Sequence, residues 1–311
     1  MVVGVADILG LSKDAIYRRL RGTTVLSANE LILLSNHFRI SASAAATDGT
    51  VPVHYNLTET EIRSPGDYLD QLMVQLDVIN TLPEFWFYLA NPGIPIFHEM
   101  MSRKLFAFKL YIYGSTCWDF PGWKNMKYRR DLIDERVLDQ ARFIAKHTHR
   151  APGRELWTMG MLSATLDQIE FMHLTGRFAR AEEAPELLAE LDKIVNHLEA
   201  MARAGRKFLP GENPSESDVS FHPAHNELAN NDNALLIDSP GRSMLFVTYI
   251  MPNYLLTENE EVCAISRDWF KSVEQLSTSL GAEGGKYRDW YFNRLRGQIN
   301  DARGRMELGK E

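Results

Sequence analysis

Five polar or charged side chains share one side of a short predicted helix near the start of the sequence. At 100° per residue they form a single arc that consists of Lys13, Asp14, Tyr17, Arg18 and Arg21. The opposite, packing face carries Ala15, Ile16 and Leu20. Ammonium and guanidinium groups bind phosphate, and a guanidinium can also hydrogen-bond the edge of a guanine base. Such a helix could pack on one face and contact double-stranded DNA with the other.

The flanking residues supply the turn and the caps that this helix requires. Gly10 stands where a tight turn between two short helices needs a positive φ, and Ser12 is placed to cap a helix that begins at Lys13. Ser27 and Glu30 form the S-x-x-E pattern of a capping box before a third helix. The apolar side of that helix carries Leu31, Leu34 and Phe38, and it is expected to end at residues 39–41.

This pattern resembles the lambda-repressor-like (XRE-type) helix-turn-helix family. The matching residues are Leu9-Gly10-Leu11-Ser12, Ile16, Arg21-Gly22 and Ile40-Ser41. The resemblance implies a DNA-binding role for the N-terminal module. Two departures from the family follow from the sequence. About one helix of sequence precedes Gly10, so the family's first helix is expected to be missing, and Arg19 stands where the family has an apolar residue.

The rest of the chain is similar to a bacterial group of transcriptional regulators with a long, mostly helical C-terminal region of unassigned role. The similarity rests on short segments at residues 15–22, 35–41, 94–98, 106–109 and 277–292. It implies the same DNA-binding role and no established ligand.

Aromatic side chains concentrate between residues 85 and 123. A helical regulator could arrange them around an apolar effector pocket, with Lys109 or Arg129 reaching an acidic group of the ligand. The candidate pocket residues are Phe85, Trp86, Lys109, Trp118 and Trp123. The same cluster also contains Phe87, Tyr88 and Phe120, and ordinary core or interface packing is the alternative explanation. An unknown small-molecule effector is therefore a hypothesis.

The best candidate metal ligands are His222, His225 and Glu227. Imidazole and carboxylate ligands suit zinc, and such a site would favour a metal-dependent hydrolase. Pro223 and the flanking loop argue against the single helical face that H-x-x-x-H sites use. The sequence also lacks the G-x-S-x-G, G-x-x-x-x-G-K-[ST] and G-x-G-x-x-G motifs. We therefore expect no metal, no other cofactor and no enzymatic activity.

Composition indicates a two-domain globular protein. The chain has 311 residues, of which 45% are hydrophobic and 24% charged. Residues 1–41 carry five basic and three acidic side chains, hence a charge of +2, and the whole chain carries −7, which leaves −9 for the remainder. Because phosphate repels an acidic body, DNA contact is expected only in the N-terminal module. Two cysteines and no membrane-length apolar run predict a cytoplasmic protein without disulfides or membrane contact.

We expect a mainly α fold in two parts. Residues 1–45 form the DNA-binding module, and residues 46–311 form a helical dimerisation and effector domain with one small β-hairpin at 233–250. Helices are expected at residues 131–149, 154–178, 184–206, 258–280 and 283–303. A further helix begins at Ser64-Pro65 and carries the apolar seam Leu69, Leu72, Leu76 and Ile79, which serves either the core or a partner helix.

The favoured hypothesis is a DNA-binding transcriptional regulator that acts as a homodimer, because one short recognition helix reads too few base pairs for useful specificity. The alternative is an effector-binding or protein-interaction module whose helix-turn-helix is vestigial. A hydrolase that uses His222 and His225 ranks third.

Overall fold

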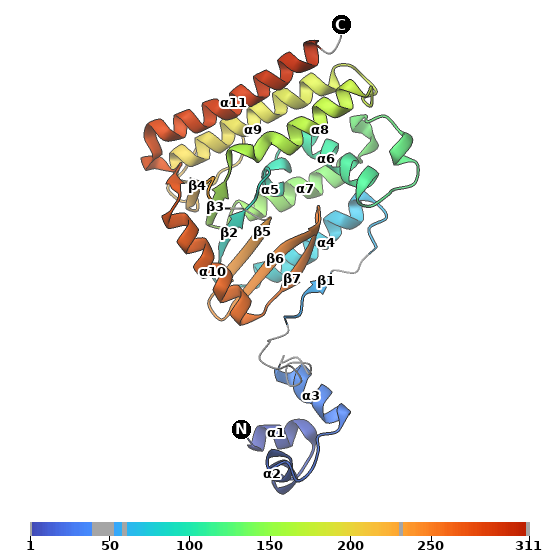
Figure 1. Cartoon of the computed structure of the whole chain (residues 1–311), viewed down its shortest axis with the longest axis vertical. Helices are drawn as coiled ribbons and strands as arrows, with labels where there is room; N and C mark the ends of the chain where they lie inside the picture. The colour runs from blue at the N-terminus through green and yellow to red at the C-terminus, as the bar shows by residue number, and fades with distance from the viewer. Residues whose placement is uncertain (1, 39–52, 58–60, 230–232, 309–311) are drawn as a thin grey trace. The chain divides into compact units, whose positions relative to one another are not determined.

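The computed structural model describes residues 2–38, 53–57, 61–229 and 233–308. The chain divides into a small unit, Met1–His54, and a large unit, Tyr55–Glu311 (Figure 1). The predicted boundary between residues 45 and 46 and the predicted end of the third helix at residues 39–41 lie outside the described residues. Each unit is described by itself below.

The described part of the small unit contains three helices, α1 (Val2–Leu9), α2 (Lys13–Leu20) and α3 (Ala28–Phe38). The predicted local geometry is confirmed. Gly10 has a φ of +63°, and the Ser12 hydroxyl accepts a hydrogen bond from the Ala15 N–H at 3.3 Å. The Ser27–Glu30 capping box also forms, with the Glu30 N–H donating to Ser27 Oγ at 3.2 Å and the Ser27 N–H donating to Glu30 Oε2 at 2.9 Å.

Arg19 ties α2 to the start of α3. Its guanidinium donates to both carboxylate oxygens of Glu30, at 3.1 and 2.6 Å, and both side chains are largely buried. The basic residue that departs from the family pattern therefore has an acidic partner, and that partner also caps α3. Ile16 packs as expected, but the assignment of Leu20 to the packing face is wrong, because Leu20 is 65% exposed.

An eight-stranded mixed sheet organises the large unit, so the prediction of a mainly α fold with one small hairpin is wrong. The strand order is β1-β7-β6-β5-β2-β3-β4-β8. The strands are β1 (Asn56–Leu57), β2 (Trp86–Ala90), β3 (Gly153–Trp157), β4 (Phe221–His225), β5 (Ala234–Ser239), β6 (Arg242–Ile250), β7 (Asn253–Thr257) and β8 (Thr278–Ser279). β2, β3 and β4 run parallel, and the other pairings are antiparallel. The predicted hairpin is present as β5 and β6, but it is only part of this sheet.

The parallel strands escaped prediction because they are short and lie in the middle of the sheet. Strands covered on both faces lack the alternation of apolar and polar residues that marks a half-exposed strand. The helix predicted over residues 154–178 is therefore β3, a 3₁₀ turn (Met159–Leu162) and only then helix α8 (Ser163–Leu174). Likewise, the loop expected around His222 is strand β4.

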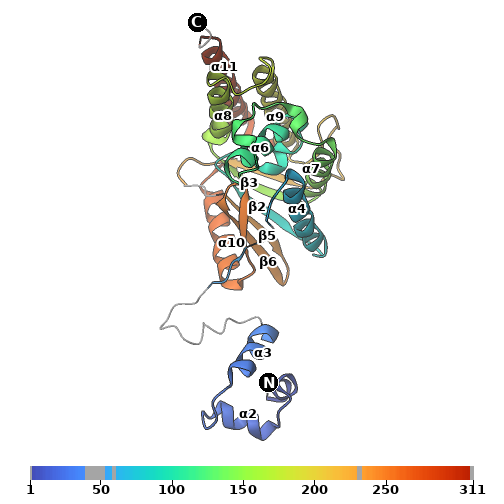
Figure 2. The same ribbon diagram turned by 90° about the vertical axis from the view of Figure 1, so that its right-hand side faces the viewer.

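Helices cover the sheet. They are α4 (Pro65–Asn80), α5 (Ile96–Glu99), α6 (Arg103–Thr116), α7 (Glu135–Thr148), α8, α9 (Glu183–Ala204), α10 (Glu260–Gln275) and α11 (Gly285–Leu308). Figure 2 shows α4 and α10 on opposite sides of the sheet. Accordingly, Tyr88 of β2 packs with α10, whereas its neighbour Phe87 packs with α4. Helices α8, α9 and α11 share a further apolar cluster with Trp157 and Phe221.

The apolar seam on α4 belongs to the core. Leu69, Leu76 and Ile79 are at most 7% exposed, and Leu72 is partly buried beside them. Of the two expectations for the seam, the structure therefore supports packing within the large unit. No helix in the described part of the chain combines the length and the apolar character needed to cross a bilayer.

Candidate functional site

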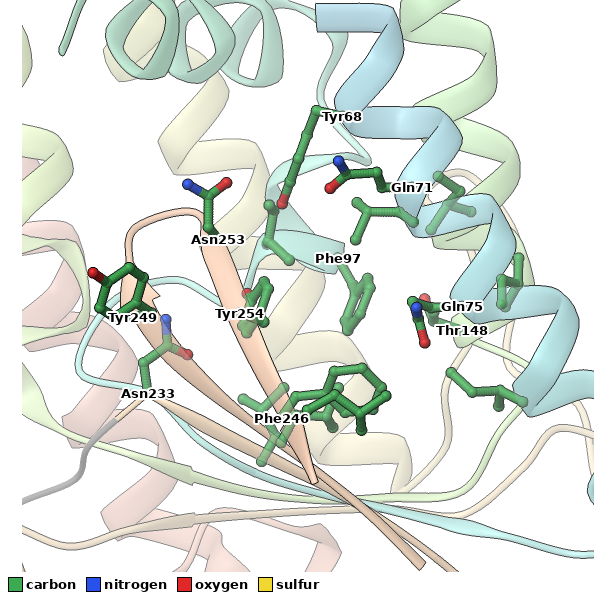
Figure 3. Close-up of a pocket in the computed structure, with 18 of the residues that line it drawn as sticks. Tyr68, Gln71, Gln75, Phe97, Thr148, Asn233, Phe246, Tyr249, Asn253 and Tyr254 are labelled. Atoms are coloured by element: carbon green, nitrogen blue, oxygen red, sulfur yellow. The ribbon is translucent and has the colours of Figure 1, made fainter. Parts of the chain in front are cut away.

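The large unit contains a cavity of about 450 Å³ between α4 and the sheet (Figure 3). Its α4 wall is formed by Leu72, Leu76 and Ile79, one apolar side of the helix. Its sheet wall is formed by alternate residues of several strands, namely Phe87, Leu89, Leu235, Phe246 and Leu256. The volume lies in the range of small-molecule sites, roughly 300–1,000 Å³.

Neutral polar side chains interrupt this apolar lining. Tyr68, Gln71 and Gln75 are three and four residues apart on α4 and share one side of it. Figure 3 shows Gln71 and Gln75 extending from α4 towards the sheet. Asn253 lies across the cavity, where its Oδ1 accepts a hydrogen bond from Trp118 Nε1 at 3.1 Å. Among the described residues that line the cavity, the only charged side chain is Glu61, which is exposed and paired with Arg63.

The hydroxyl group of Tyr68 is buried and has no hydrogen-bond partner among the described residues. Figure 3 shows this side chain extending into the space between Asn253 and Phe97. Burial raises the pKa of Tyr68 well above its usual value, and Tyr254 and nearby groups raise it further. The phenol therefore stays protonated and can donate. A buried donor without an acceptor is costly, so this hydroxyl is a candidate ligand contact.

A buried ionic cluster lies behind one wall of the cavity. Glu155 of β3 accepts a hydrogen bond from Trp157 Nε1 at 3.0 Å and lies 2.9 Å from His98 Nε2. Lys207 Nζ is 3.9 Å from the other carboxylate oxygen, and all of these side chains are buried. Burial acts to raise the pKa of Glu155, but His98 and Lys207 outweigh it and lower the pKa to about 2. Glu155 is therefore ionised.

The Lys207 side chain of this cluster passes close to the backbone of β3. A Cβ on Gly153 would collide with the end of the buried Lys207 side chain, so a larger residue at position 153 would require that lysine to shift. Burial lowers the pKa of Lys207, and Glu155 opposes that effect. His149 packs edge-on against His98, with ring centroids 5.5 Å apart. Burial lowers the pKa of His149 to about 3, so it is neutral near pH 7.

The cluster and the cavity are neighbours in the fold. Phe87, Leu89, Phe97 and Thr148 line the cavity and also enclose a small void that touches His98, His149, Glu155 and Lys207. These uncharged side chains separate the ionic cluster from the cavity. The cluster therefore packs behind one wall of the cavity and does not present a charge to it.

The structure does not bring the five predicted effector-pocket residues together. Of these, only Trp118 lines the cavity. Phe85 packs edge-on against Phe87. Trp86 faces the α10 side, where it stacks on His222 and lies under the Arg154 guanidinium. Lys109 is buried 3.3 Å from Glu99, and Trp123 stacks on Tyr111.

The other residues of the predicted cluster lie in different parts of the large unit. Phe87 lines the cavity, whereas Tyr88 lies on the opposite face of the sheet. Phe120 stacks on Trp118, and Arg129 pairs with Asp131 at the surface. The polar residues Tyr68, Gln71 and Gln75 were missed. Their signal was present in the sequence as a polar row beside the Leu69 to Ile79 seam.

The five predicted DNA-contacting residues are all exposed on the small unit. Lys13 and Asp14 occupy the first turn of α2, and Tyr17 follows one turn later with 46% of its surface exposed. Arg18 lies 3.4 Å from Asp14, and Arg21 is the C-cap residue. The helix therefore presents a hydrogen-bonding face to solvent.

The candidate metal ligands do not converge. His222 and His225 are three apart on strand β4, so they face opposite sides of the sheet. His225 Nε2 lies 2.8 Å from Glu227, and its Nδ1 lies 2.7 Å from the Tyr287 hydroxyl. Within the described residues, no group of three or more His, Cys, Asp or Glu side chains could hold a metal ion.

Comparisons of the chain with protein-family models, with curated proteins and with solved structures found no match.

Proposed function

We propose that this chain is a ligand-responsive transcriptional regulator. The small unit binds double-stranded DNA through α2, and the large unit binds a small-molecule effector. The observation that carries the proposal is the exposed face of α2, with Lys13, Tyr17, Arg18 and Arg21 on a helix whose start is fixed by the Ser12 cap. In helix-turn-helix proteins, the first residues of such a helix contact base edges in the major groove.

The DNA-binding role fits the construction of the small unit. The Arg19–Glu30 pair is turned inward between α2 and α3, which leaves the other basic groups of α2 exposed. The positive charge of residues 1–41 contrasts with the acidic remainder, so phosphate is attracted to the small unit alone. The proposed reading helix, α2, is only eight residues long and reads few base pairs by itself, so we propose that a homodimer binds two half-sites.

The effector role rests on the cavity of the large unit. A cavity of this size with a few neutral polar groups is typical of small-molecule sites. It also favours the alternative, an effector-binding module whose helix-turn-helix is vestigial. A hydrolase based on His222 and His225 has no such support, because the two histidines are on opposite faces of the sheet. Both cysteines are free thiols, which supports a cytoplasmic location.

We expect Arg18→Ala and Lys13→Ala to weaken DNA binding in different ways. If Arg18 reads a guanine edge, its loss should cost about 1–3 kcal/mol on the preferred site. If Lys13 holds a phosphate, its loss should weaken binding to all sequences and reduce the salt slope by about 1. Mobility-shift titrations at several salt concentrations, on duplexes selected from a random pool, measure both effects.

Lys193→Ala is the matched control, because Lys193 is an exposed lysine of α9 in the large unit. It should leave binding unchanged. Equal affinity of both α2 variants and the unmodified protein would refute the assignment of α2. Absence of any DNA binding by the unmodified dimer would favour the effector-binding module.

A further inference from the structure

We propose that the cavity binds an uncharged, predominantly hydrocarbon ligand whose carbonyl or hydroxyl oxygen accepts a hydrogen bond from Tyr68. This inference names the effector class and so rests on the proposed function, but ligand binding can be measured without DNA.

The walls select for hydrophobic ligands. Leu72, Leu76, Phe87 and Phe246 are contributed from both sides of the cavity, and ligand atoms packed between them would be removed from water on opposite faces. Long polar ligands would lose their hydration here without a matching number of protein partners.

The absence of an available charge in the described lining selects against ions. Glu61 is the one charged side chain there, it is mostly exposed, and it already pairs with Arg63. Lys207 is a buried cation behind the wall, but Phe87 and Phe97 intervene and Glu155 is its partner. A carboxylate ligand would therefore be desolvated without a counter-ion, which is strongly unfavourable.

Tyr68 supplies the specific polar contact. Its hydroxyl is buried and has no partner among the described residues, while its ring is held against Trp118 with centroids 4.9 Å apart. The side chain is therefore positioned before any ligand arrives. A ligand oxygen would satisfy the hydroxyl, whereas an alkane would leave it unsatisfied.

The test uses the full chain and three probes with the same chain length: undecan-2-one, undecane and undecanoate. Displacement of the uncharged dye Nile red at pH 7.5 reports their relative affinities. The ketone should bind at least about tenfold more tightly than the carboxylate, which follows from the cost of burying an unpaired charge.

Tyr68→Phe should weaken ketone binding about tenfold, the effect of one buried hydrogen bond, and leave undecane binding unchanged. Because the hydroxyl has no hydrogen-bond partner among the described residues, the melting temperature of the ligand-free variant should not fall. A tyrosine with a purely structural hydrogen bond would show the reverse, a lower melting temperature and unchanged affinity. Tyr88→Phe is the matched control, since Tyr88 lies on the opposite face of the sheet.

Leu72→Trp places a large side chain in the cavity and should abolish binding of the ketone and of undecane. Three results would overturn the inference: undecanoate binding more tightly than the ketone, Tyr68→Phe binding the ketone as tightly as the unmodified protein, or no binding by any probe. Mobility shifts on the same preparations report DNA binding separately, so failure of the cavity assignment is distinguishable from failure of the regulator proposal.

Discussion

Glu155→Gln is expected to lower the free energy of unfolding of the large unit by about 3–5 kcal/mol, the range for removing one partner of a buried ion pair. Glu155 is 4% exposed, and its carboxylate contacts His98, Trp157 and Lys207. Glutamine keeps the shape of the side chain but not its charge. It therefore leaves Lys207 buried between the rings of Phe87 and Phe221 without an anion.

Urea denaturation followed by tryptophan fluorescence measures this loss. Lys193→Met is the surface control and should change the free energy of unfolding by no more than about 0.5 kcal/mol. Lys207→Met combined with Glu155→Gln should cost less than the sum of the two single variants, because the uncompensated charge is gone. A loss below about 1 kcal/mol for Glu155→Gln would show that the cluster is not a coupled ionic unit.

Acidification from pH 7.5 to 4.5 is expected to destabilise the large unit through His149. Burial lowers the pKa of His149 from 6.5 to about 3, with His98 and Lys207 adding to the effect. The folded protein therefore binds fewer protons than the unfolded chain below pH 6.5. The stability that arises from keeping His149 neutral is fully present above pH 6.5 and is lost as the pH falls towards 3. By pH 4.5 the loss from this group is about 3 kcal/mol.

His149→Gln isolates the contribution, because it removes the titrating group and keeps a polar side chain. The unmodified protein should lose about 3 kcal/mol more than this variant between the two pH values, as measured by urea denaturation at each pH. Burial also lowers the pKa of His197, to about 4, but His197 is present in both proteins and cancels in the difference. An equal loss of unfolding free energy in the unmodified protein and in His149→Gln would contradict the assignment of this pH dependence to His149.

Predictions that depend on neighbouring residues were accurate. Ser12, Ser27 and Ser64 cap their helices through hydrogen bonds that span three residues, so residue type and spacing are sufficient to identify them. The exposed face of α2 follows from the same local rule, since helical periodicity assigns its residues to one arc. Leu20 shows the limit of that rule, because a side chain on an apolar arc is buried only if another element covers it.

Predictions that depend on distant pairing failed. Phe87 pairs with Gly153 and Gly153 with Phe221, so the parallel sheet joins segments more than sixty residues apart. Each of these strands is five residues long, and a short apolar strand covered on both faces has the same composition as part of a buried helix. This is why residues 154–157 were assigned to a helix.

The sequence by itself determined the helix caps, the turn at Gly10 and the division of α2 into a packing face and a polar face, because these features arise from contacts within a few residues. It also contained the row Tyr68, Gln71 and Gln75, which periodicity places on one side of α4. Only the tertiary structure decided what that row faces. The cavity requires α4 to lie against strands from residues 86–90 and 234–257, and the ionic state of Glu155 requires Lys207 and His98 to meet beneath it. Burial and long-range pairing are properties of the folded chain, and they converted ordinary residues into a candidate site.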